Sequence, residues 1–361
     1  MGASLTELPV NSRPTVRING EQKTAVDELL NAMMLHETAD GMSALELSFV
    51  DWVARPSSEP EFAFGDNAVL KLGADVKVYG GDTSSPQEIF RGRISALESD
   101  CNVDSPPNLI VLAEDSLNAA RKTRRCETYE GAALADVVRK IAGRHGLRAT
   151  VKDLPSVTSD WVQLNESDLA FLRRIASRFD VAIQVVADEL QAMPFGAEPR
   201  GTLELRWNDK LLSVRVTADL AQQSKALSVA GYDSARGSAT VQTGAAGNLG
   251  PGRGRNGFAL VEASLHSGVS ENLGHFGELT TAEAKAMANA AFNQRARGFV
   301  TAQGLADGNP ALRVGTWITL KRVNPLFEGD YVVREARHAF SLKTGYTTAF
   351  TAQSAFWGGV A

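Results

Sequence analysis

The sequence contains only two cysteines, Cys101 and Cys126, in 361 residues. Two thiols are too few for a disulfide framework or for a zinc site made of cysteines alone. We expect both to be free thiols, as is usual for a protein made in a reducing cytoplasm. A single disulfide between the two is the alternative.

The chain also lacks long apolar segments and an excess of positive charge. No apolar run approaches about 18 residues, so no membrane-spanning helix is expected. The first residues have no basic head followed by an apolar stretch, so no secretory signal is expected either. The 37 Lys and Arg face 42 Asp and Glu, and this net charge of −5 argues against nucleic-acid binding by the chain as a whole. Hydrophobic residues make up 43%, which is enough for packed cores and too many for a disordered acidic chain.

Short alternating apolar runs separated by turn signals predict β-strands over residues 15–118. In the run from Leu45 to Phe49 every second residue is apolar, as a strand with one buried face requires. Such spacing favours a sandwich or a barrel. One helix is predicted to interrupt the strands, because five apolar residues follow at helical spacing: Val26, Leu29, Leu30, Met33 and Met34.

The pattern changes to helices and strands over residues 121–200. Leu134, Val137 and Ile141 lie at helical spacing, Gly146 follows where a helix C-cap belongs, and a strand is expected next. Ser167 is a suitable N-cap for a second helix, which precedes a second strand. The two helix–strand units predict a small α/β module.

Strand patterns return after residue 201 and continue to the end of the chain. Gly, Ser and Asn dominate much of residues 233–280, which predicts a linker or a long loop. Thr280 and Glu283 form a capping box, and an Ala-rich helix is expected over about 282–297. The predicted domains are therefore 1–120 (β), 121–200 (α/β insertion) and 201–361 (β, with the loop and the helix).

An internal repeat links the two β regions. Leu70–Val78 aligns with Leu312–Leu320, and Phe90–Ile94 aligns with Phe327–Tyr331 after a shorter loop. Glycines recur in both segments: Gly73 and Gly315 permit a bend or bulge, while Gly92 and Gly329 stand where a bulky side chain would crowd a neighbour. The repeat predicts two versions of one β domain, and these four glycines are our candidates for shaping it. Three such chains can build a ring with approximate sixfold symmetry.

At these residues the chain resembles the late control D family, which comprises the baseplate hub of contractile phage tails and the hub half of VgrG-type spikes. The segment QLNESDLAFLRRIA (residues 163–176) resembles the family's "ESDLAFLRRLA" helix. The sequence Phe90-Arg91-Gly92-Arg93-Ile94 matches the F-x-G-x-V element of its first barrel. The closing stretch that contains FEGDYVV (residues 327–333), His338 and TGYTT (residues 344–348) is similar to its last barrel strands.

The resemblance implies a mainly β fold, with two tube-protein-like β-barrels flanking the α/β insertion. It implies a homotrimer that joins a threefold spike to the sixfold inner tube, acting without catalysis or a cofactor. The implied partners are a separate spike protein of the OB and β-helix type, the first inner-tube ring, and baseplate wedge or LysM-type proteins. The protein would be made in the bacterial cytoplasm and assembled into the baseplate of a phage-tail-like particle. A particle-associated cell-wall hydrolase is the alternative function.

Few residue patterns suggest chemistry. The residues Gly252–Gly257 match G-x-G-x-x-G, but no apolar strand precedes them, so we interpret them as linker rather than a dinucleotide site. The five histidines are scattered, and none has the acidic or thiol neighbours that a metal site needs. Acidic pairs such as Asp188-Glu189 occur, but a glycosidase needs two carboxylates across a cleft, which spacing alone does not show. We therefore predict no catalytic, cofactor-binding or metal-binding residues.

Positive charge is concentrated in the insertion. Residues 121–178 carry a net charge of +5, against −10 for the remainder. A solvated helix face is the simpler explanation of this concentration. The alternatives are a basic face that docks an acidic baseplate neighbour and, against the overall charge, a nucleic-acid contact. The candidate docking residues form one short run: Arg121, Lys122, Arg124 and Arg125.

Overall fold

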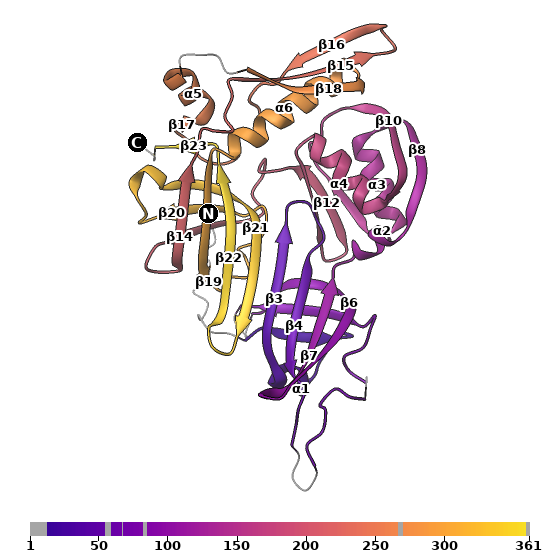
Figure 1. Cartoon of the computed structure of the whole chain (residues 1–361), viewed down its shortest axis with the longest axis vertical. Coiled ribbons are helices and arrows are strands. Elements are labelled where there is room, and N and C mark those ends of the chain that lie inside the picture. The colour runs from indigo at the N-terminus through magenta and orange to yellow at the C-terminus, as the bar shows by residue number, and fades with distance from the viewer. Residues whose placement is uncertain (1–12, 55–58, 67, 82–84, 266–269, 359–361) are drawn as a thin grey trace.

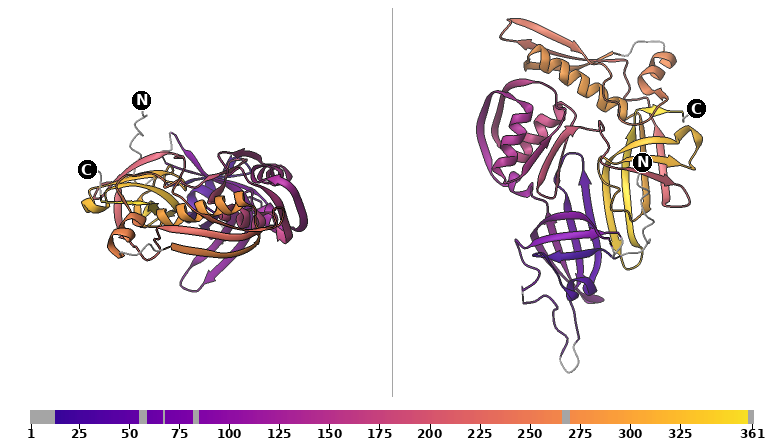
Figure 2. Two further views of the ribbon diagram at one scale, coloured as in Figure 1. Left: turned by 90° about the horizontal axis from the view of Figure 1, so that it is seen from above. Right: turned by 180° about the vertical axis from the view of Figure 1, so that it is seen from behind.

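The computed structural model describes residues 13–54, 59–66, 68–81, 85–265 and 270–358. Figure 1 shows the first β unit at the lower end of the molecule. The second β unit lies above it on the left of the view, and the α/β insertion lies above it on the right. A helix with a small sheet lies across the top, and the view from behind in Figure 2 shows the same arrangement. Three of the hydrophobic clusters are large, and they occupy the first unit, the second unit and the insertion with its covering helix.

The first β unit contains six main strands in the spatial order β3-β4-β7-β6-β5-β1. The predicted helix over residues 26–34 is wrong beyond Leu29, because the chain enters a strand at Leu30 that pairs on both edges. Met33 is buried there, whereas Met34 is 48% exposed, which is strand alternation rather than a helical stripe. The elements are β1 (Thr15–Ile18), β2 (Glu21–Gln22), α1 (Thr24–Leu29), β3 (Leu30–Thr38), β4 (Ala44–Val50), β5 (Asp75–Gly80), β6 (Gln87–Asn102) and β7 (Ser105–Glu114).

The insertion forms the predicted pair of helix–strand units. The hydroxyl of Ser167 accepts a hydrogen bond from the Ala170 amide, as expected for an N-cap. Phe171, Leu172 and Ile175 of the second helix are fully buried in the core of the module. The elements are α2 (Asn118–Lys122), β8 (Arg124–Ala133), α3 (Leu134–Arg144), β9 (Arg148–Val151), β10 (Thr158–Ser167), α4 (Asp168–Arg178), β11 (Val181–Val186) and β12 (Glu189–Pro194).

The second β unit repeats the strand order of the first. Its spatial order is β14-β19-β22-β21-β20-β13, so each position matches the strand of the same rank in the first unit. The outermost pair differs in direction, because β13 runs parallel to β20 whereas β1 runs antiparallel to β5. The strands are β13 (Thr202–Arg206), β14 (Leu211–Ala218), β19 (Val300–Asp307), β20 (Trp317–Lys321), β21 (Gly329–Ser341) and β22 (Gly345–Ser354).

The bulges of the two units also coincide. The first bulge in each unit lies between Leu30 and Ala32 of β3 and between Leu211 and Ser213 of β14. The second lies between Ile94 and Ala96 of β6 and between Val333 and Glu335 of β21. Bulges bend a strand at a fixed place, so their coincidence makes β3 equivalent to β14 and β6 equivalent to β21, residue by residue.

The equivalence confirms one glycine pair of the predicted repeat and corrects the other. The Gly73 and Gly315 amides donate to the Ile94 and Val333 carbonyls, both at 2.8 Å. Ile94 and Val333 therefore occupy equivalent positions. Gly92, which lies opposite Val76 in the ladder, then corresponds to Tyr331 rather than to Gly329, so the predicted alignment of this second segment is wrong by two residues.

The predicted loop over residues 233–280 is largely ordered, which corrects that boundary. Small polar residues such as those of β16 form a sheet that α6 covers from one side, so the strands have no alternating apolar signal. Helix α6 begins at Thr281 behind the predicted capping box of Thr280 and Glu283. The elements of this region are β15 (Ala226–Asp233), β16 (Ser238–Thr243), β17 (Arg255–Asn256), α5 (Gly257–Leu265), β18 (Ser270–Glu278) and α6 (Thr281–Arg297). Two short elements near the C-terminal end complete the set, η1 (Pro325–Phe327) and β23 (Phe356–Trp357).

The two β units form one continuous sheet. Residues 335–341 of β21 pair antiparallel with residues 32–38 of β3, which joins the second unit to the first. The fold is mainly β with an α/β insertion between two related β units, as predicted. The described strands follow an open path, and no ladder among them closes either unit into a complete barrel.

Candidate functional site

The seam between β3 and β21 contains a buried ion pair. Glu37 points from β3 toward Arg313, which lies in the turn before β20. The Arg313 Nε lies 2.8 Å from Glu37 Oε1 and 2.7 Å from Oε2, and an Nη also contacts the carboxylate. Burial opposes ionisation of Glu37, but Arg313 outweighs it and holds the pKa of Glu37 below its usual range. The pair therefore holds the two units together through a charge that neither could bury alone.

A histidine completes the polar centre of the seam. His338 of β21 is fully buried, and its Nδ1 lies 2.8 Å from the Tyr346 hydroxyl and 3.3 Å from the Thr348 hydroxyl. Burial lowers the pKa of His338 to about 4; the negative charge of Glu37 opposes this shift, and the positive charge of Arg313 adds to it. At neutral pH the imidazole is therefore uncharged and contributes hydrogen bonds rather than charge.

A second buried ion pair fixes the insertion to α6. Arg297 of α6 is 1% exposed and contacts Asp180, which follows α4. The same guanidinium donates to the Asn248 carbonyl and lies over the Phe195 ring, 5.5 Å from its centroid. Three segments that are distant in sequence thus meet at one side chain.

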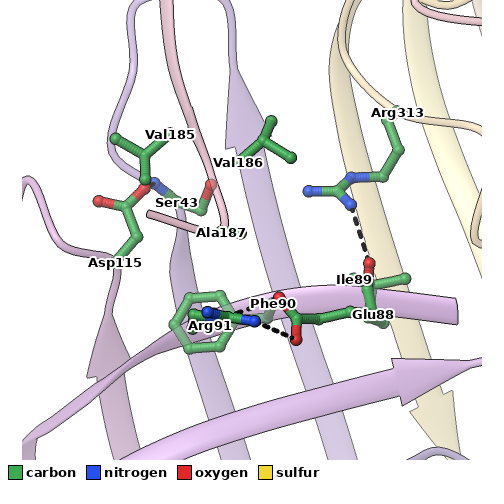
Figure 3. A pocket seen from close by; sticks show the side chains of 10 residues that line it. All are labelled: Ser43, Glu88, Ile89, Phe90, Arg91, Asp115, Val185, Val186, Ala187 and Arg313. Carbon is green, nitrogen blue, oxygen red and sulfur yellow. Dashed lines mark hydrogen bonds and ion pairs between the residues drawn. The ribbon is translucent and has the colours of Figure 1, made fainter. Parts of the chain in front are cut away.

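A small cavity lies where the first unit, the insertion and the second unit meet (Figure 3). Its volume is about 30 Å³, which leaves room for roughly one or two water molecules and not for a substrate. Asp115 accepts hydrogen bonds from the Ser43 amide at 2.6 Å and the Leu117 amide at 2.9 Å, and burial raises its pKa to about 6. On the opposite wall in Figure 3, Arg313 points toward the Glu88 carbonyl. The cavity is part of the junction rather than an active site.

A larger cleft of about 980 Å³ lies between the β5–β6 face and α2. Charged side chains line much of it, including Lys77, Arg93, Lys122 and Asp188.

The structure uses most of the predicted basic run internally. Arg121 pairs with Glu114 at 2.6 Å, Arg124 donates to the Asn165 carbonyl, and Arg125 lies 3.5 Å from Asp168. Within the described ranges only Lys122 of this run has no such partner, and it lines the large cleft. The docking hypothesis therefore depends mainly on Lys122.

Asp168 is the shared acidic partner of several basic side chains in the insertion. It is 1% exposed and accepts hydrogen bonds from Arg144 at 2.8 Å and Gln163 at 3.0 Å, while His145 Nε2 lies 2.8 Å away. Burial raises the pKa of Asp168, but these donors outweigh burial and leave it below its usual range. Part of the positive charge of residues 121–178 is therefore neutralised inside the module.

The four predicted glycines differ in their surroundings. Gly73 and Gly315 have left-handed φ values of +82° and +84°, which side chains rarely adopt. A Cβ on Gly92 would lie 2.1 Å from the Glu114 carbonyl oxygen, so only glycine fits there. Nothing lies within 4 Å of a Cβ on Gly329, so the predicted crowding is wrong at that position.

The remaining candidates are a glycine-rich segment, the histidines and the two cysteines. The last glycine of the G-x-G-x-x-G segment begins α5, and the two-residue strand β17 lies inside the segment rather than before it, which does not match a dinucleotide site. No cluster of three or more metal-ligating side chains occurs among the described residues, and His266 lies outside them. Cys101 and Cys126 are both exposed free thiols. None of the described helices is long and apolar enough to cross a membrane.

Sequence reasoning missed the two buried ion pairs. Glu37 and Arg313 are 276 positions apart, and Asp180 and Arg297 are 117 apart. One sequence gives no signal for such partners, because each charge reads locally as an ordinary polar residue of a strand or turn.

Comparison with known proteins gives one family and several similar structures. The family model described as the Alg8 N-terminal domain matches residues 11–341, so the chain belongs to this family. No curated protein matches the sequence.

The similar solved structures include three bacterial proteins. The 43 kDa tail protein of prophage MuSo2 from Shewanella oneidensis is 12% identical, with a TM-score of 0.62 over 94% of this chain and 97% of that one. The tail protein from Neisseria meningitidis MC58 is 11% identical, with a TM-score of 0.63 over 94% and 96%. The Escherichia coli c3393 protein, a component of the type VI secretion system, is 13% identical, with a TM-score of 0.60 over 96% and 79%. At these identities the likeness shows a shared tail-protein-like fold.

Proposed function

We propose that this member of the Alg8 N-terminal domain family is a structural hub of a contractile tail or injection-system baseplate. Three copies would present six β units to the first inner-tube ring, and the other face of the trimer would receive a threefold spike. The function is symmetry adaptation, and no side chain acts as a catalyst. The proposal rests chiefly on one observation, the duplicated strand order with coincident bulges.

The likeness to named structures supports this proposal. Two of the similar proteins are described as tail proteins, and the c3393 protein is described as structurally similar to the T4 tail proteins gp27 and gp5. A chain of the same fold that carries two related β units can match a sixfold tube with three copies. We propose the late control D and VgrG-type hubs as its functional relatives.

The buried pairs of the junction suit a hub. A ring closes only when the rotation between successive units is constant, so the two units of one chain need a fixed relative orientation. Glu37 and Arg313 join the units, and Asp180 and Arg297 fix the insertion to α6. The proposed partners are a separate spike protein, the first tube ring, and baseplate wedge or LysM-type proteins around them. The assembly would be part of a phage, tailocin or injection-system particle.

The test is the symmetry of the purified chain, alone and co-expressed with a candidate spike protein. Negative-stain class averages should show threefold rings with six lobes of similar size, and mass photometry should give three times the 38.6 kDa chain mass. Compact monomers in both samples would refute the proposal. A peptidoglycan clearing assay on the same samples tests the hydrolase alternative, and we expect no clearing.

A further inference from the structure

Two open edges of the sheet, one on β14 and one on β6, are equivalent to the two sides of the internal seam. Within the chain, β3 of the first unit pairs with the second half of β21. By the coincident bulges, β14 is the counterpart of β3, and β6 is the counterpart of β21. In the described part of the chain, β14 pairs with β19 and, at its first residue Leu211, makes a single bridge to Trp207, so residues 213–218 have one free edge. Residues 96–102 of β6 pair only with β7. Both counterpart edges are therefore unoccupied by this chain.

We propose that β14 of one copy pairs antiparallel with residues 96–102 of β6 in a second copy. The inference rests on the proposed hub function for the number of copies, and on the strand geometry for the contact itself. The internal seam supplies the register, since Met34 lies opposite Ala339 and Met33 lies opposite Phe340. Their counterparts place Arg215 opposite Asp100 and Val214 opposite Cys101. In the same way, His36 lies opposite Arg337 in the seam, which places Thr217 opposite Glu98.

The charges along the two edges complement each other in this register. Arg215 is exposed on β14, and it has no ion-pair partner among the described residues. Asp100 on β6 accepts a hydrogen bond from the Asn102 side-chain amide at 2.9 Å and has no ion-pair partner in the described ranges, and Glu98 on the same strand is exposed. Opposite charges on directly paired residues favour pairing, and a register shifted by one residue would turn Arg215 to the other face.

The two edges also offer free backbone hydrogen-bonding groups and half-buried apolar side chains to a strand partner. An unpaired edge offers a row of backbone N–H and C=O groups, which proteins usually block by charge, proline or cover. Val214, Val216 and Leu97 are half-buried and become covered when the edges pair. In the internal seam the counterparts of Val216 and Leu97, which are Leu35 and Ala336, are fully buried.

The contact is of the head-to-tail kind. Each copy has one β14 edge and one β6 edge, so every copy binds two neighbours through different surfaces. Such interfaces form a ring when the rotation closes and a filament when it does not. In a ring of three, internal seams and seams between copies alternate around the axis.

Cysteine trapping tests the register directly. Residues directly opposite in an antiparallel pair have Cα atoms about 4.5–5.5 Å apart, which is within the range of a disulfide. Val214→Cys, placed in a Cys126→Ser background, should form a disulfide with the native Cys101 of the next copy. Mild oxidation should then give covalent dimers and trimers on a non-reducing gel, and reduction should return the single chain.

Two matched controls define the expected result. The same variant with Cys101→Ser should give no covalent oligomer. Arg215→Cys in the Cys126→Ser background moves the thiol by one residue to the opposite face, so it should form far less of the disulfide. Equal trapping at both positions would overturn the proposed register.

A charge exchange tests the same contact without cysteines. Arg215→Glu should weaken association by about fivefold per seam, measured by mass photometry over a dilution series. The paired exchange of Arg215→Glu with Asp100→Arg should restore it.

The outcomes separate this inference from the proposed hub function. A wild-type trimer whose variants neither trap nor respond to charge would overturn the strand pairing and leave the hub intact. A wild-type chain that remains monomeric, alone and with its spike, would overturn both.

Discussion

The buried pair of Glu37 and Arg313 permits a quantitative test of the seam. Glu37→Gln keeps the size of the side chain and removes its charge. It leaves the Arg313 guanidinium at the seam without a counter-ion, close to Arg200, whose pKa burial already lowers to about 10. The two positive charges then oppose the pairing of β3 with β21.

The expected loss follows from the burial of the carboxylate. Glu37 is 4% exposed, and it receives hydrogen bonds from Arg313 on both oxygens. Removing one partner of a buried pair typically costs about 3–5 kcal/mol, because the other charge stays buried and unpaired. The Arg313 side chain is 25% exposed, which favours the lower end of this range. Gln still accepts one hydrogen bond, so we expect about 3 kcal/mol in the free energy of unfolding. Replacing both residues by Met should recover most of this loss.

The assay combines urea unfolding at pH 7.5 with hydrogen exchange of the β21 amides. Exchange locates the loss, since opening of the seam should accelerate residues 336–341 before the rest of the sheet. The control is Glu198→Gln, which removes an exposed pair with Lys152 (3.0 Å, about half exposed on both sides) and should cost under about 1 kcal/mol. A Glu37→Gln variant as stable as this control would refute the reasoning.

Three further predictions concern single side chains. Because the pKa of His338 is lowered to about 4, only the unfolded chain binds its proton between about pH 6.5 and 4, so stability should fall by about 3 kcal/mol as pH drops through that range. His338→Gln should remove this part of the pH dependence in urea unfolding at pH 4.5 and 7. Gly92→Ala should cost roughly 3 kcal/mol through its clash with backbone, against about 1 kcal/mol for Gly73→Ala, where only the φ angle is unfavourable. Equal melting temperatures of these two variants would contradict the glycine assignment. Lys122→Glu should weaken co-purification with an acidic baseplate partner without changing stability, and unchanged salt dependence of that co-purification would exclude docking through this residue.

Local signals in the sequence predicted much of the fold. The Ser167 N-cap, the Thr280 and Glu283 capping box, and the repeat at Gly73 and Gly315 depend on residues close in the chain, and the structure contains all of them. The strand at Leu30 was missed because its helical spacing is overridden by pairing on both edges.

The candidate site could not be predicted to the same extent. Two contacts join the units: the pairing of β3 with β21 and the ion pair of Glu37 with Arg313. The local sequence around each partner contains no pattern that identifies the other partner. The basic run was visible as charge, but its internal partners Glu114 and Asp168 become neighbours only in the folded chain. The sequence therefore predicted the units themselves but not the strand pairing and ion pairs that connect them.

The position of β3 has a consequence for synthesis on the ribosome. Its partner β21 emerges about 300 residues later, which at about 5–20 residues per second leaves the β3 edge without its partner for roughly 15–60 s. An unoccupied edge is a template for aggregation, and an inward-facing charge is one of the devices that blocks it. Glu37 is such a charge until Arg313 arrives. The residue that stabilises the finished sheet would thus also protect the nascent chain while it is incomplete.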